Sequence, residues 1–293
     1  MYKKPVIIAE VGCNHMGDFN IAKEFIEMAH IFCKVDWVKF QKRNPKECLT
    51  EEQYNSPHPT EWHSYGKTYG EHREFLEFNI EQHRELKAYC EKFGLIYSTS
   101  VWDMTSAKEV AQLNPVAIKI PSACNTHYEM LDWLCKNYNG EIHVSLGMTT
   151  RDEEEALIAF FEKRNRNKDV ILYACTSGYP VPAEDVCLLE ITRIKEKYGH
   201  RVKDIGFSGH HNGIALDIAA YTLGANYIER HFTLNRTWKG TDHAASLEPD
   251  GLRRLARDLR NTHIALSYKK EEILEIEKPQ REKLKYIRTK YLN

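Results

Sequence analysis

The chain has 293 residues, which is enough for one large α/β barrel or two ordinary domains. Its formal net charge of -1 gives no reason to expect nucleic acid or an anionic membrane surface as a partner. No apolar stretch approaches the roughly 20 residues that span a bilayer, and the first apolar run is interrupted too early by Glu10 for a signal peptide. The eight cysteines have no close-set ligand pattern, so we expect free thiols and a cytoplasmic location.

Eight short apolar runs alternate with helical patterns along the chain. This alternation predicts parallel strands with right-handed crossovers, and eight repeats favour a TIM barrel, a single α/β domain, over an open doubly wound sheet. The predicted strands are Val6–Gly12, Trp37–Gln41, Ile96–Val101, Val116–Ser122, Glu141–Gly147, Val170–Ser177, Asp204–His210 and Tyr227–Thr233. The predicted helices are Asn20–Cys33, Ile80–Phe93, Thr105–Leu113, Tyr128–Tyr138, Arg151–Lys163, Glu184–Tyr198, Gly213–Leu223 and Pro249–Leu266.

Two segments depart from this regular pattern. The connection 42–79 is rich in His, Tyr and Pro and is too long for an ordinary loop, which is typical of a lid, a binding loop or an interface. Its histidines His58, His63 and His72 are expected on the surface. We assign residues 1–268 to the barrel domain and 269–293 to a short charged tail.

Polar residues stand at the ends of the predicted strands, where a TIM barrel carries its chemistry. His210 and His231 end two adjacent strands, so both imidazoles can face one site and hold a metal. Lys39 and Lys119, together with several hydroxyl groups, indicate a phosphorylated anionic substrate beside that metal. The other polar residues in this pattern are Glu10, Asn14, His15, Gln41, Thr99, Ser100, Ser122, Ser145, Thr176, Ser177, Tyr179, Ser208 and Glu229.

Each of these residues also has a structural interpretation. Lys39 and Lys119 could instead form salt bridges with carboxylates inside the barrel. A lone histidine is more often structural than a ligand, and His211 and His243 lie close enough in the sequence to compete for the assignment. Cys124 and Cys175 have no evident general base, so we interpret them as buried structural thiols rather than nucleophiles.

Seven motifs in the same order resemble the sialic acid synthase family, the N-acetylneuraminate synthases and their relatives. They are IIAEVGCNHMGD, WVKFQ, IKIPSA, VSLGMTT, CTSGYPVP, GFSGHHNGIALDIAA and IERHFT…KGTDHAASLEP. They span Ile7 to Pro249, nearly the whole predicted barrel. The resemblance implies a TIM barrel that condenses phosphoenolpyruvate (PEP) with an aldose, giving a 2-keto-3-deoxy sugar acid and phosphate by C–O cleavage.

The resemblance also implies roles for individual residues. It implies that His210 and His231 hold the metal and that Glu10 lies at the reaction centre. The residues matching positions that hold PEP are Lys119, Ser122, Ser145 and Ser208. The residues matching polar or acceptor-side positions are Lys39, Gln41, Ser177, Tyr179 and Asp242.

Departures from the family pattern concentrate on the acceptor side. The family's Gly-Glu after Ser122 is here Ala123-Cys124, so a carboxylate near the sugar is lost. The aspartate usual before the first metal histidine is Gly209, and an asparagine is replaced by Ser177. The family's carboxy-terminal antifreeze-like domain, which contributes an arginine to the partner's sugar site, has no counterpart in the sequence. These changes predict that N-acetylmannosamine is a poor acceptor compared with another aldose.

The expected cofactor is a divalent metal bound by two imidazoles, with open positions for water and substrate oxygens. Mixed N/O ligation favours Mn²⁺, with Mg²⁺ or Co²⁺ as alternatives. The expected partners are PEP and an aldose, with no nucleic acid or membrane, and the expected assembly is a homodimer. Two other functions stay open: a metal-dependent aldolase or isomerase on the same barrel, and a non-catalytic sugar-binding or coat-associated relative.

Overall fold

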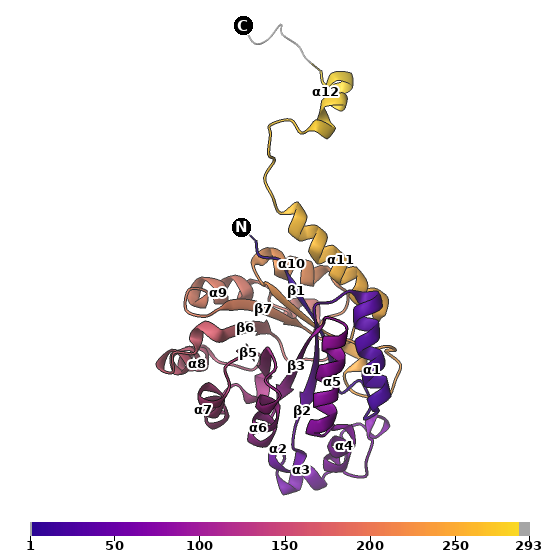
Figure 1. Ribbon diagram of the computed structural model, residues 1–293, viewed down its shortest axis with the longest axis vertical. Helices are drawn as coiled ribbons and strands as arrows, with labels where there is room; N and C mark the ends of the chain where they lie inside the picture. Colours follow the sequence, from indigo (N-terminus) through magenta and orange to yellow (C-terminus); the bar gives the residue numbers. More distant parts are fainter. Residues whose placement is uncertain (1, 287–293) are drawn as a thin grey trace.

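Eight parallel strands close into one barrel in the computed structural model, which describes residues 2–286 (Figure 1). The strands pair in sequence order, and β8 returns to β1 with Glu10 beside His231. Their bounds are β1 Val6–Gly12, β2 Trp37–Lys42, β3 Ile96–Val101, β4 Ala117–Ile120, β5 Glu141–Ser145, β6 Val170–Cys175, β7 Asp204–Gly209 and β8 Tyr227–His231. The predicted TIM barrel is confirmed, although most strands end before the predicted residue because the polar motifs continue as loops.

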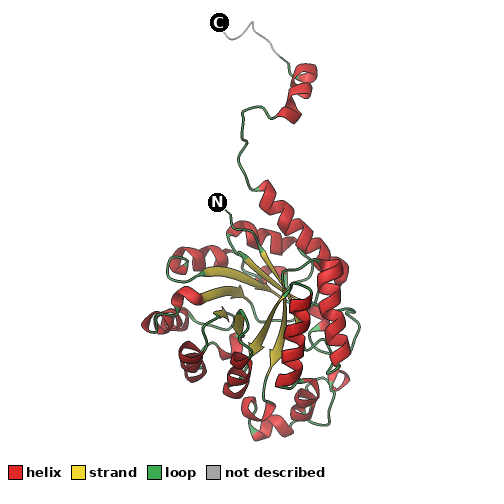
Figure 2. Ribbon diagram, viewed as in Figure 1, coloured by secondary structure: helices red, strands yellow, loops and turns green. Residues whose placement is uncertain are grey.

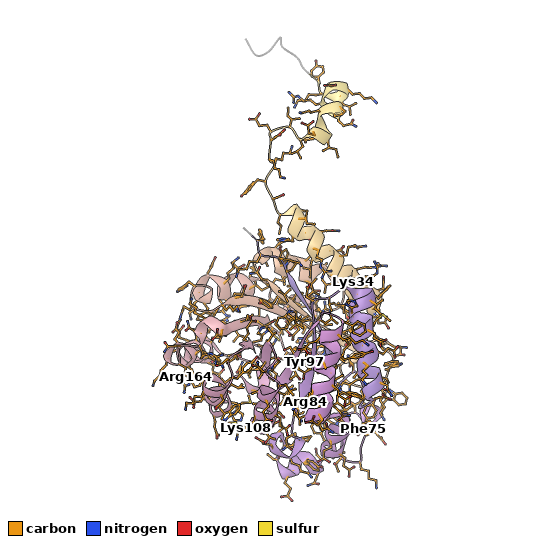
Figure 3. The ribbon with its side chains drawn as sticks, in the orientation of Figure 1. Lys34, Phe75, Arg84, Tyr97, Lys108 and Arg164 are labelled. Atoms are coloured by element: carbon orange, nitrogen blue, oxygen red, sulfur yellow. The ribbon has the colours of Figure 1, made fainter. Side chains whose placement is uncertain are left out.

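Helices form a ring around the barrel, as Figure 2 shows. The ring comprises α1 Phe19–Met28, α5 Ile80–Lys92, α6 Met104–Gln112, α7 Tyr128–Asn137, α8 Arg151–Lys163, α9 Leu189–Tyr198, α10 Ala215–Leu223 and α11 Pro249–Ala265. The helix predicted to run to Cys33 changes after Met28 into a π-helical turn, η1 Ala29–Cys33. Outward-facing side chains such as Arg84 and Lys108 are exposed (Figure 3), whereas the apolar stripe of each helix packs on the strands.

Side chains point alternately outward and inward along each strand, so the core has two regions: one between the strands and the helices, and one inside the barrel. In β1, Ile7, Ala9 and Val11 point outward and pack under the helices, while Ile8 points into the barrel. The amino-terminal half of the barrel interior is filled by Ile8, Trp37, Ala117, Ile171 and Tyr173. Because large side chains fill this half, open space remains only toward the carboxyl ends of the strands.

The segment 42–79 folds into short helices rather than an irregular loop. These are α2 Pro45–Cys48, α3 Glu51–Asn55, the 3₁₀ turn η2 Glu61–His63 and α4 Tyr69–Leu76. The segment touches the loop after β8 at two points, since Tyr65 Oη donates to the Lys239 carbonyl at 2.6 Å and Gly240 N donates to His63 Nδ1 at 3.1 Å.

One surface assignment in this segment was wrong. His72 is only 2% exposed, and its ring stacks with those of Tyr65 and Tyr69. Its Nδ1 accepts a hydrogen bond from the Tyr65 backbone N–H at 3.1 Å. His58 and His63 are half-buried. The imidazole of His72 therefore organises the segment instead of facing water.

Beyond α11 the chain leaves the barrel, and α12 Lys278–Leu284 stands clear of it (Figure 1). Apolar side chains on this stretch, including Tyr268 and Ile276, are largely exposed. The part of the predicted 269–293 tail beyond residue 286 lies outside the described residues. Within residues 2–286, no helix is both long enough and apolar enough to cross a membrane.

Candidate active site

Every second side chain of a strand points into the barrel. These inward side chains are apolar near the amino ends of several strands and polar near their carboxyl ends. Ile8 is followed by Glu10, Trp37 by Lys39 and Gln41, and Tyr227 by Glu229 and His231. The result is a cavity of about 330 Å³ at the carboxyl ends of the strands. The candidate residues that line it are Glu10, Lys39, Gln41, Lys119, Ser122, Ser145, Ser177, Tyr179, Ser208, His210 and His231.

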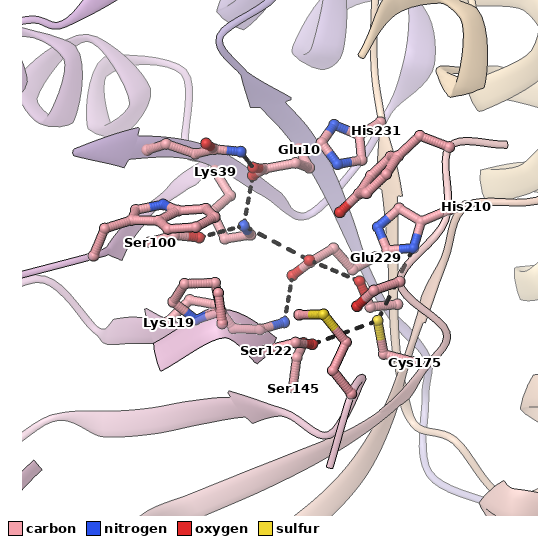
Figure 4. Close-up of a pocket in the computed structure, with 18 residues that line it drawn as sticks. Glu10, Lys39, Ser100, Lys119, Ser122, Ser145, Cys175, His210, Glu229 and His231 are labelled. Atoms are coloured by element: carbon pink, nitrogen blue, oxygen red, sulfur yellow. Dashed lines mark hydrogen bonds and ion pairs between the residues drawn. The ribbon is translucent and has the colours of Figure 1, made fainter. Parts of the chain in front are cut away.

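Two lysines and two glutamates form a connected network on the cavity floor (Figure 4). Lys39 Nζ lies 2.6 Å from Glu10 Oε2, 2.8 Å from Ser100 Oγ and 3.6 Å from Glu229 Oε1. Lys119 Nζ lies 3.0 Å from Glu229 Oε2. The salt bridges left open as an alternative are therefore present, and both ammonium groups still face the cavity.

Burial and charge act against each other in this network. Burial raises the pKa of Glu10 and lowers the pKa of Lys119. Burial also opposes ionisation of Glu229, but the ammonium groups of Lys119 and Lys39 outweigh it and hold the pKa of Glu229 well below its usual range. Lys39 is affected in the opposite sense, since Glu10 and Glu229 raise its pKa despite burial. The arrangement therefore favours a charged Lys39 beside a charged Glu229.

Serine hydroxyl groups also line the cavity. Ser122 Oγ accepts from Gly147 N at 3.0 Å. A Cβ at Gly147 would lie 2.5 Å from Ser177 Oγ and 2.7 Å from Ser122 Oγ, so only glycine leaves room for both serines. On the floor, Ser208 Oγ donates to Glu229 Oε1 at 3.1 Å. Hydroxyl donors of this kind suit the oxygens of a phosphate or carboxylate.

The two candidate metal ligands face each other across the cavity mouth. The rings of His210 and His231 have centroids 5.4 Å apart, and Tyr179 packs 4.5 Å from His210. His210 Nδ1 lies 3.0 Å from the Thr176 carbonyl, which fixes its proton on Nδ1 and leaves Nε2 with a free lone pair. His231 Nδ1 is buried without a hydrogen-bond partner in the described chain. Both imidazoles thus fit a metal, as ordered nitrogen donors.

These two histidines do not form a complete protein ligand set. Among residues 2–286, no group of three or more His, Cys, Asp or Glu side chains is arranged to hold an ion. An ion at this place would need water or substrate oxygens to complete its shell. The competing histidines are engaged elsewhere: His211 Nε2 lies 3.3 Å from Asp217, and His243 Nδ1 lies 2.7 Å from Thr233 Oγ1.

Among the residues to which the family resemblance gave a role, Asp242 alone does not line the cavity. The strand-end residues Asn14, His15, Thr99 and Thr176, which were given no role, do not line it either. Asp242 lies just beside the cavity, because a Cβ at Gly12 would be 3.5 Å from Asp242 Oδ2 and 3.4 Å from Glu10 Oε1. Gln41 Nε2 donates to Glu10 Oε1 at 2.8 Å, and its Oε1 accepts from Arg43 Nη2. This side of the site is therefore built by β1, β2 and the loop after β8.

The assignment from sequence gave one functional position no role and missed another. Glu229 was named among the polar strand-end residues without a role, and in the structure it bridges Lys39 and Lys119. Tyr173 lies beneath Lys119, whose Nζ is 3.4 Å from the ring centroid. Nothing in the sequence distinguishes Tyr173 from an ordinary core aromatic residue, because its role depends on which strand lies opposite.

A family model described as the NeuB family matches residues 25–271. The chain belongs to the NeuB family. The resemblance inferred from the seven motifs is thereby confirmed, and the match covers most of the barrel.

Named relatives of the NeuB family agree with this assignment. The chain is 38% identical over 280 residues to N-acetylneuraminate-9-phosphate synthase of Homo sapiens, covering 95% of this chain and 76% of the relative. It is 34% identical over 265 residues to N,N'-diacetyllegionaminic acid synthase of Campylobacter jejuni, covering 90% and 78%. The structure of N-acetylneuraminic acid synthetase from Leptospira borgpetersenii, in complex with citrate, superposes with a TM-score of 0.80 at 27% identity, covering 96% and 91%. The chain is an enzyme of this class, a sugar acid synthase.

Proposed function

We propose that this NeuB-family enzyme condenses PEP with an aldose to give a 2-keto-3-deoxy sugar acid and inorganic phosphate. The observation that carries the proposal is the convergence of the ammonium groups of Lys39 and Lys119 with several serine hydroxyls on one cavity of about 330 Å³. A small polyanion fits such a set of donors. An aldolase or isomerase acting without PEP would not need so many anion-binding groups.

PEP would be held by residues from several strand ends. Lys119, Ser122, Ser145 and Ser208 supply the donors for its phosphate and carboxylate. Before PEP binds, Glu229 neutralises Lys119 and Lys39, so the buried cations are not left unpaired. The substrate oxygens would then take over part of this pairing.

The condensation makes one C–C bond and breaks one C–O bond. Carbon 3 of PEP bonds to the aldehyde carbon of the acceptor, and a water oxygen adds at carbon 2. The bond from carbon 2 to the phosphate oxygen then breaks, and phosphate leaves. Glu10 is placed to hold the water or move its proton, because Lys39 and Gln41 fix its carboxylate from two sides.

A divalent metal, in our proposal Mn²⁺ or alternatively Mg²⁺ or Co²⁺, would be held by His210 and His231. When bound, it supplies Lewis acid polarisation of the acceptor carbonyl. The Thr176 carbonyl that orients His210 and the unpartnered Nδ1 of His231 support this assignment.

The identity of the acceptor is not fixed by family membership. Among the relatives, one is named as a synthase of a 9-phosphate and another as a synthase of diacetyllegionaminic acid. Cys124 replaces the family carboxylate, whereas Tyr179 and Asp242 remain close to the cavity. We propose that the segment 42–79 closes the acceptor side as a lid and that N-acetylmannosamine is a poor substrate.

Two further proposals concern the setting of the enzyme. We propose a cytoplasmic homodimer that works without nucleic acid or membrane partners. The eight cysteines, all unpaired by disulfides, support a reducing compartment. Exposed apolar side chains such as Ile31, Phe32 and Trp62 support association with another copy of the chain.

Phosphate release tests the proposed reaction. The purified chain with Mn²⁺ should release inorganic phosphate from PEP only when an aldose from a panel of plain, N-acylated and phosphorylated sugars is present. PEP labelled with ¹⁸O in the bridging C2–O position should deliver that label to the phosphate, since the C–O bond breaks. Aldose conversion that proceeds without PEP, or label retained in the sugar acid, would contradict the proposal.

A further inference from the structure

The outer side of the two strands that carry the candidate metal ligands holds a buried pair of charges. Side chains alternate along β7 and β8, so His210 and His231 face the cavity (Figure 4), whereas Arg230 points away from it. Arg230 is only 1% exposed, and Asp217 of α10 is fully buried beside it. Because burying two charges is costly, packing alone would favour apolar residues at these positions.

Arg230 connects the end of β8 to the chain that follows β7. Its Nη2 donates to the His211 carbonyl, and its Nη1 donates to the Gly213 carbonyl at 2.8 Å. His211 directly follows His210 in the chain, and Arg230 directly precedes His231. The guanidinium therefore bridges, from outside the barrel, the same two segments that a metal would bridge from inside.

Asp217 fixes the guanidinium in this position. Its Oδ2 lies 2.5 Å from Arg230 Nη1 and 3.3 Å from His211 Nε2. The His211 Nε2 atom also lies 3.1 Å from Arg230 Nη1. Charge-assisted hydrogen bonds are strong, and the low dielectric of the interior strengthens them further. The three side chains therefore tie α10, β8 and the loop after β7 together.

Gly209 leaves the space that this cluster needs. A Cβ at position 209 would lie 2.8 Å from Phe207 Cε1, 3.0 Å from His211 Cε1 and 3.1 Å from Arg230 Cδ. A larger residue would thus force the Phe207 ring or the cluster to move. The family usually has an aspartate at this position, just before the first metal histidine. In this chain the carboxylate on the outer side of the strands comes instead from Asp217.

Strand pairing does not by itself set the separation of the two imidazoles. The last paired residues of β7 and β8 are Gly209 and Arg230. His210 and His231 come one residue later, beyond the end of this ladder. At that point the Arg230 side chain supplies a connection between the two segments.

We propose that Arg230, held by Asp217, is a positioning residue that sets the separation of the two metal-binding imidazoles. It contacts neither substrate nor metal and acts through the backbone next to His210. The inference rests on the proposed function, because it concerns the metal site of the same reaction. Groups that orient metal ligands from behind commonly change metal affinity by about 10- to 100-fold when they are removed.

Manganese binding by the full chain tests this role. The Kd for Mn²⁺ is measured from the electron paramagnetic resonance signal of free Mn²⁺, and the Kd for PEP by calorimetry on chelated protein. Asp217→Asn keeps the shape of the side chain and removes its charge. The Kd for Mn²⁺ should rise at least about tenfold, because the guanidinium loses its anchor. The Kd for PEP should change by less than about threefold, since most of the proposed PEP donors belong to other strands.

The matched control is Glu154→Gln, which also exchanges a buried carboxylate for an amide. Glu154 is 2% exposed, pairs with Arg193 at 2.7 Å and does not line the active-site cavity. Its substitution should leave the Kd for Mn²⁺ at the wild-type value. This control separates the loss of a buried ion pair in general from the loss of the pair behind the two histidines.

Arg230→Lys is the second variant, with circular dichroism to verify folding. It keeps a positive charge beside Asp217, so it serves in place of Asp217→Asn if that variant does not fold. A single ammonium group cannot hold the carboxylate and both carbonyls in the geometry of the guanidinium. The Kd for Mn²⁺ should therefore rise about tenfold here as well.

An unchanged Kd for Mn²⁺ in a folded variant would overturn the proposal. Equal rises in the Kd values for Mn²⁺ and PEP would also overturn it, as would a rise for Mn²⁺ in Glu154→Gln, because the pair would then serve only general stability. Absence of Mn²⁺ binding by the wild-type chain would instead refute the metal site, which belongs to the proposed function, and the positioning role with it.

Discussion

Lys119 is held in place by an aromatic ring as well as by a carboxylate. Its Nζ lies 3.4 Å from the centroid of the Tyr173 ring, in addition to its ion pair with Glu229. The Tyr173 hydroxyl is held by His143 Nδ1 at 2.8 Å. Gly206 leaves space for the ring, since a Cβ there would lie 2.6 Å from it. The ring face offsets the burial of the ammonium group.

Two substitutions of Tyr173 should therefore distinguish the contribution of its ring to PEP binding from the contribution of its hydroxyl. Tyr173→Leu removes the cation–π contact and should raise the KM for PEP by about tenfold, roughly 1.4 kcal/mol. Tyr173→Phe keeps the ring and should change this KM by less than about threefold. The KM is measured by phosphate release, with circular dichroism to verify folding. Similar effects of both substitutions would show that the ring face is not what matters.

Lys119 itself should be essential for PEP binding. Lys119→Ala leaves a polyanion short of a countercharge and leaves Glu229 with one partner fewer, so PEP affinity should fall about 100-fold or more. Titration calorimetry of PEP without the acceptor measures this directly. Unchanged affinity would remove Lys119 from the PEP site.

The imidazoles of His210 and His231 should be needed for metal and turnover but not for folding. His210→Ala and His231→Ala each remove one of the two proposed metal-binding nitrogens, so metal content and turnover should both be lost. Metal analysis after dialysis against Mn²⁺ gives a readout besides activity. His243→Ala, at a histidine outside the cavity, is the control. Full activity of a chelated sample would contradict a metal role.

At the scale of elements, the segment 42–79 and the loop after β8 act as one unit. Tyr65→Phe removes the 2.6 Å hydrogen bond to the Lys239 carbonyl, at a cost of about 1 kcal/mol. If the segment closes the acceptor side, the acceptor KM should rise about fivefold in the phosphate-release assay while the PEP KM stays constant. Equal rises in the acceptor KM and the PEP KM would indicate that the substitution disturbs the whole active site, and would contradict a lid over the acceptor side.

The barrel strands show how local patterning positions distant groups. Several strands contribute inward polar side chains above an inward apolar one, as in Ile8 and Glu10 or Tyr227 and Glu229. The helices mainly add the outer packing. A substitution of an inward strand residue thus changes the active site directly, whereas a substitution of an exposed helix residue such as Arg84 does not.

For the whole molecule, buried neutral histidines should limit stability in acid. Burial lowers the pKa of His15 and of His83 to about 3, from 6.5 when unperturbed. Between these values the unfolded chain binds protons that the folded chain does not, so the free energy of unfolding falls as the pH drops below 6.5. Each histidine contributes about 1.4 kcal/mol per pH unit in that window.

Urea denaturation at pH 7, 6 and 5 checks this dependence. Above pH 6.5 the contribution of both histidines is fully present, and the free energy of unfolding should decline below it. His83→Gln should flatten the decline by about 1.4 kcal/mol per pH unit. Identical slopes for the two proteins would show that His83 protonates equally in both states.

The sequence by itself determined the barrel and most of the site. Strict alternation of apolar runs with helical patterns left few other ways to bury every strand, and polar residues at strand ends had to share one face. Hence eleven candidates lie on one cavity and Asp242 just outside it. Family membership followed from motifs that are contiguous in the chain.

Only the tertiary structure decided which groups meet across the barrel. Glu229 bridges Lys39 and Lys119 from a strand far along the chain, and Tyr173 supports Lys119 from β6. His72 is buried because the segment 42–79 folds into helices around it. The physical reason is that sequence patterns fix periodicity within one element, whereas charge pairing and burial depend on the register between elements.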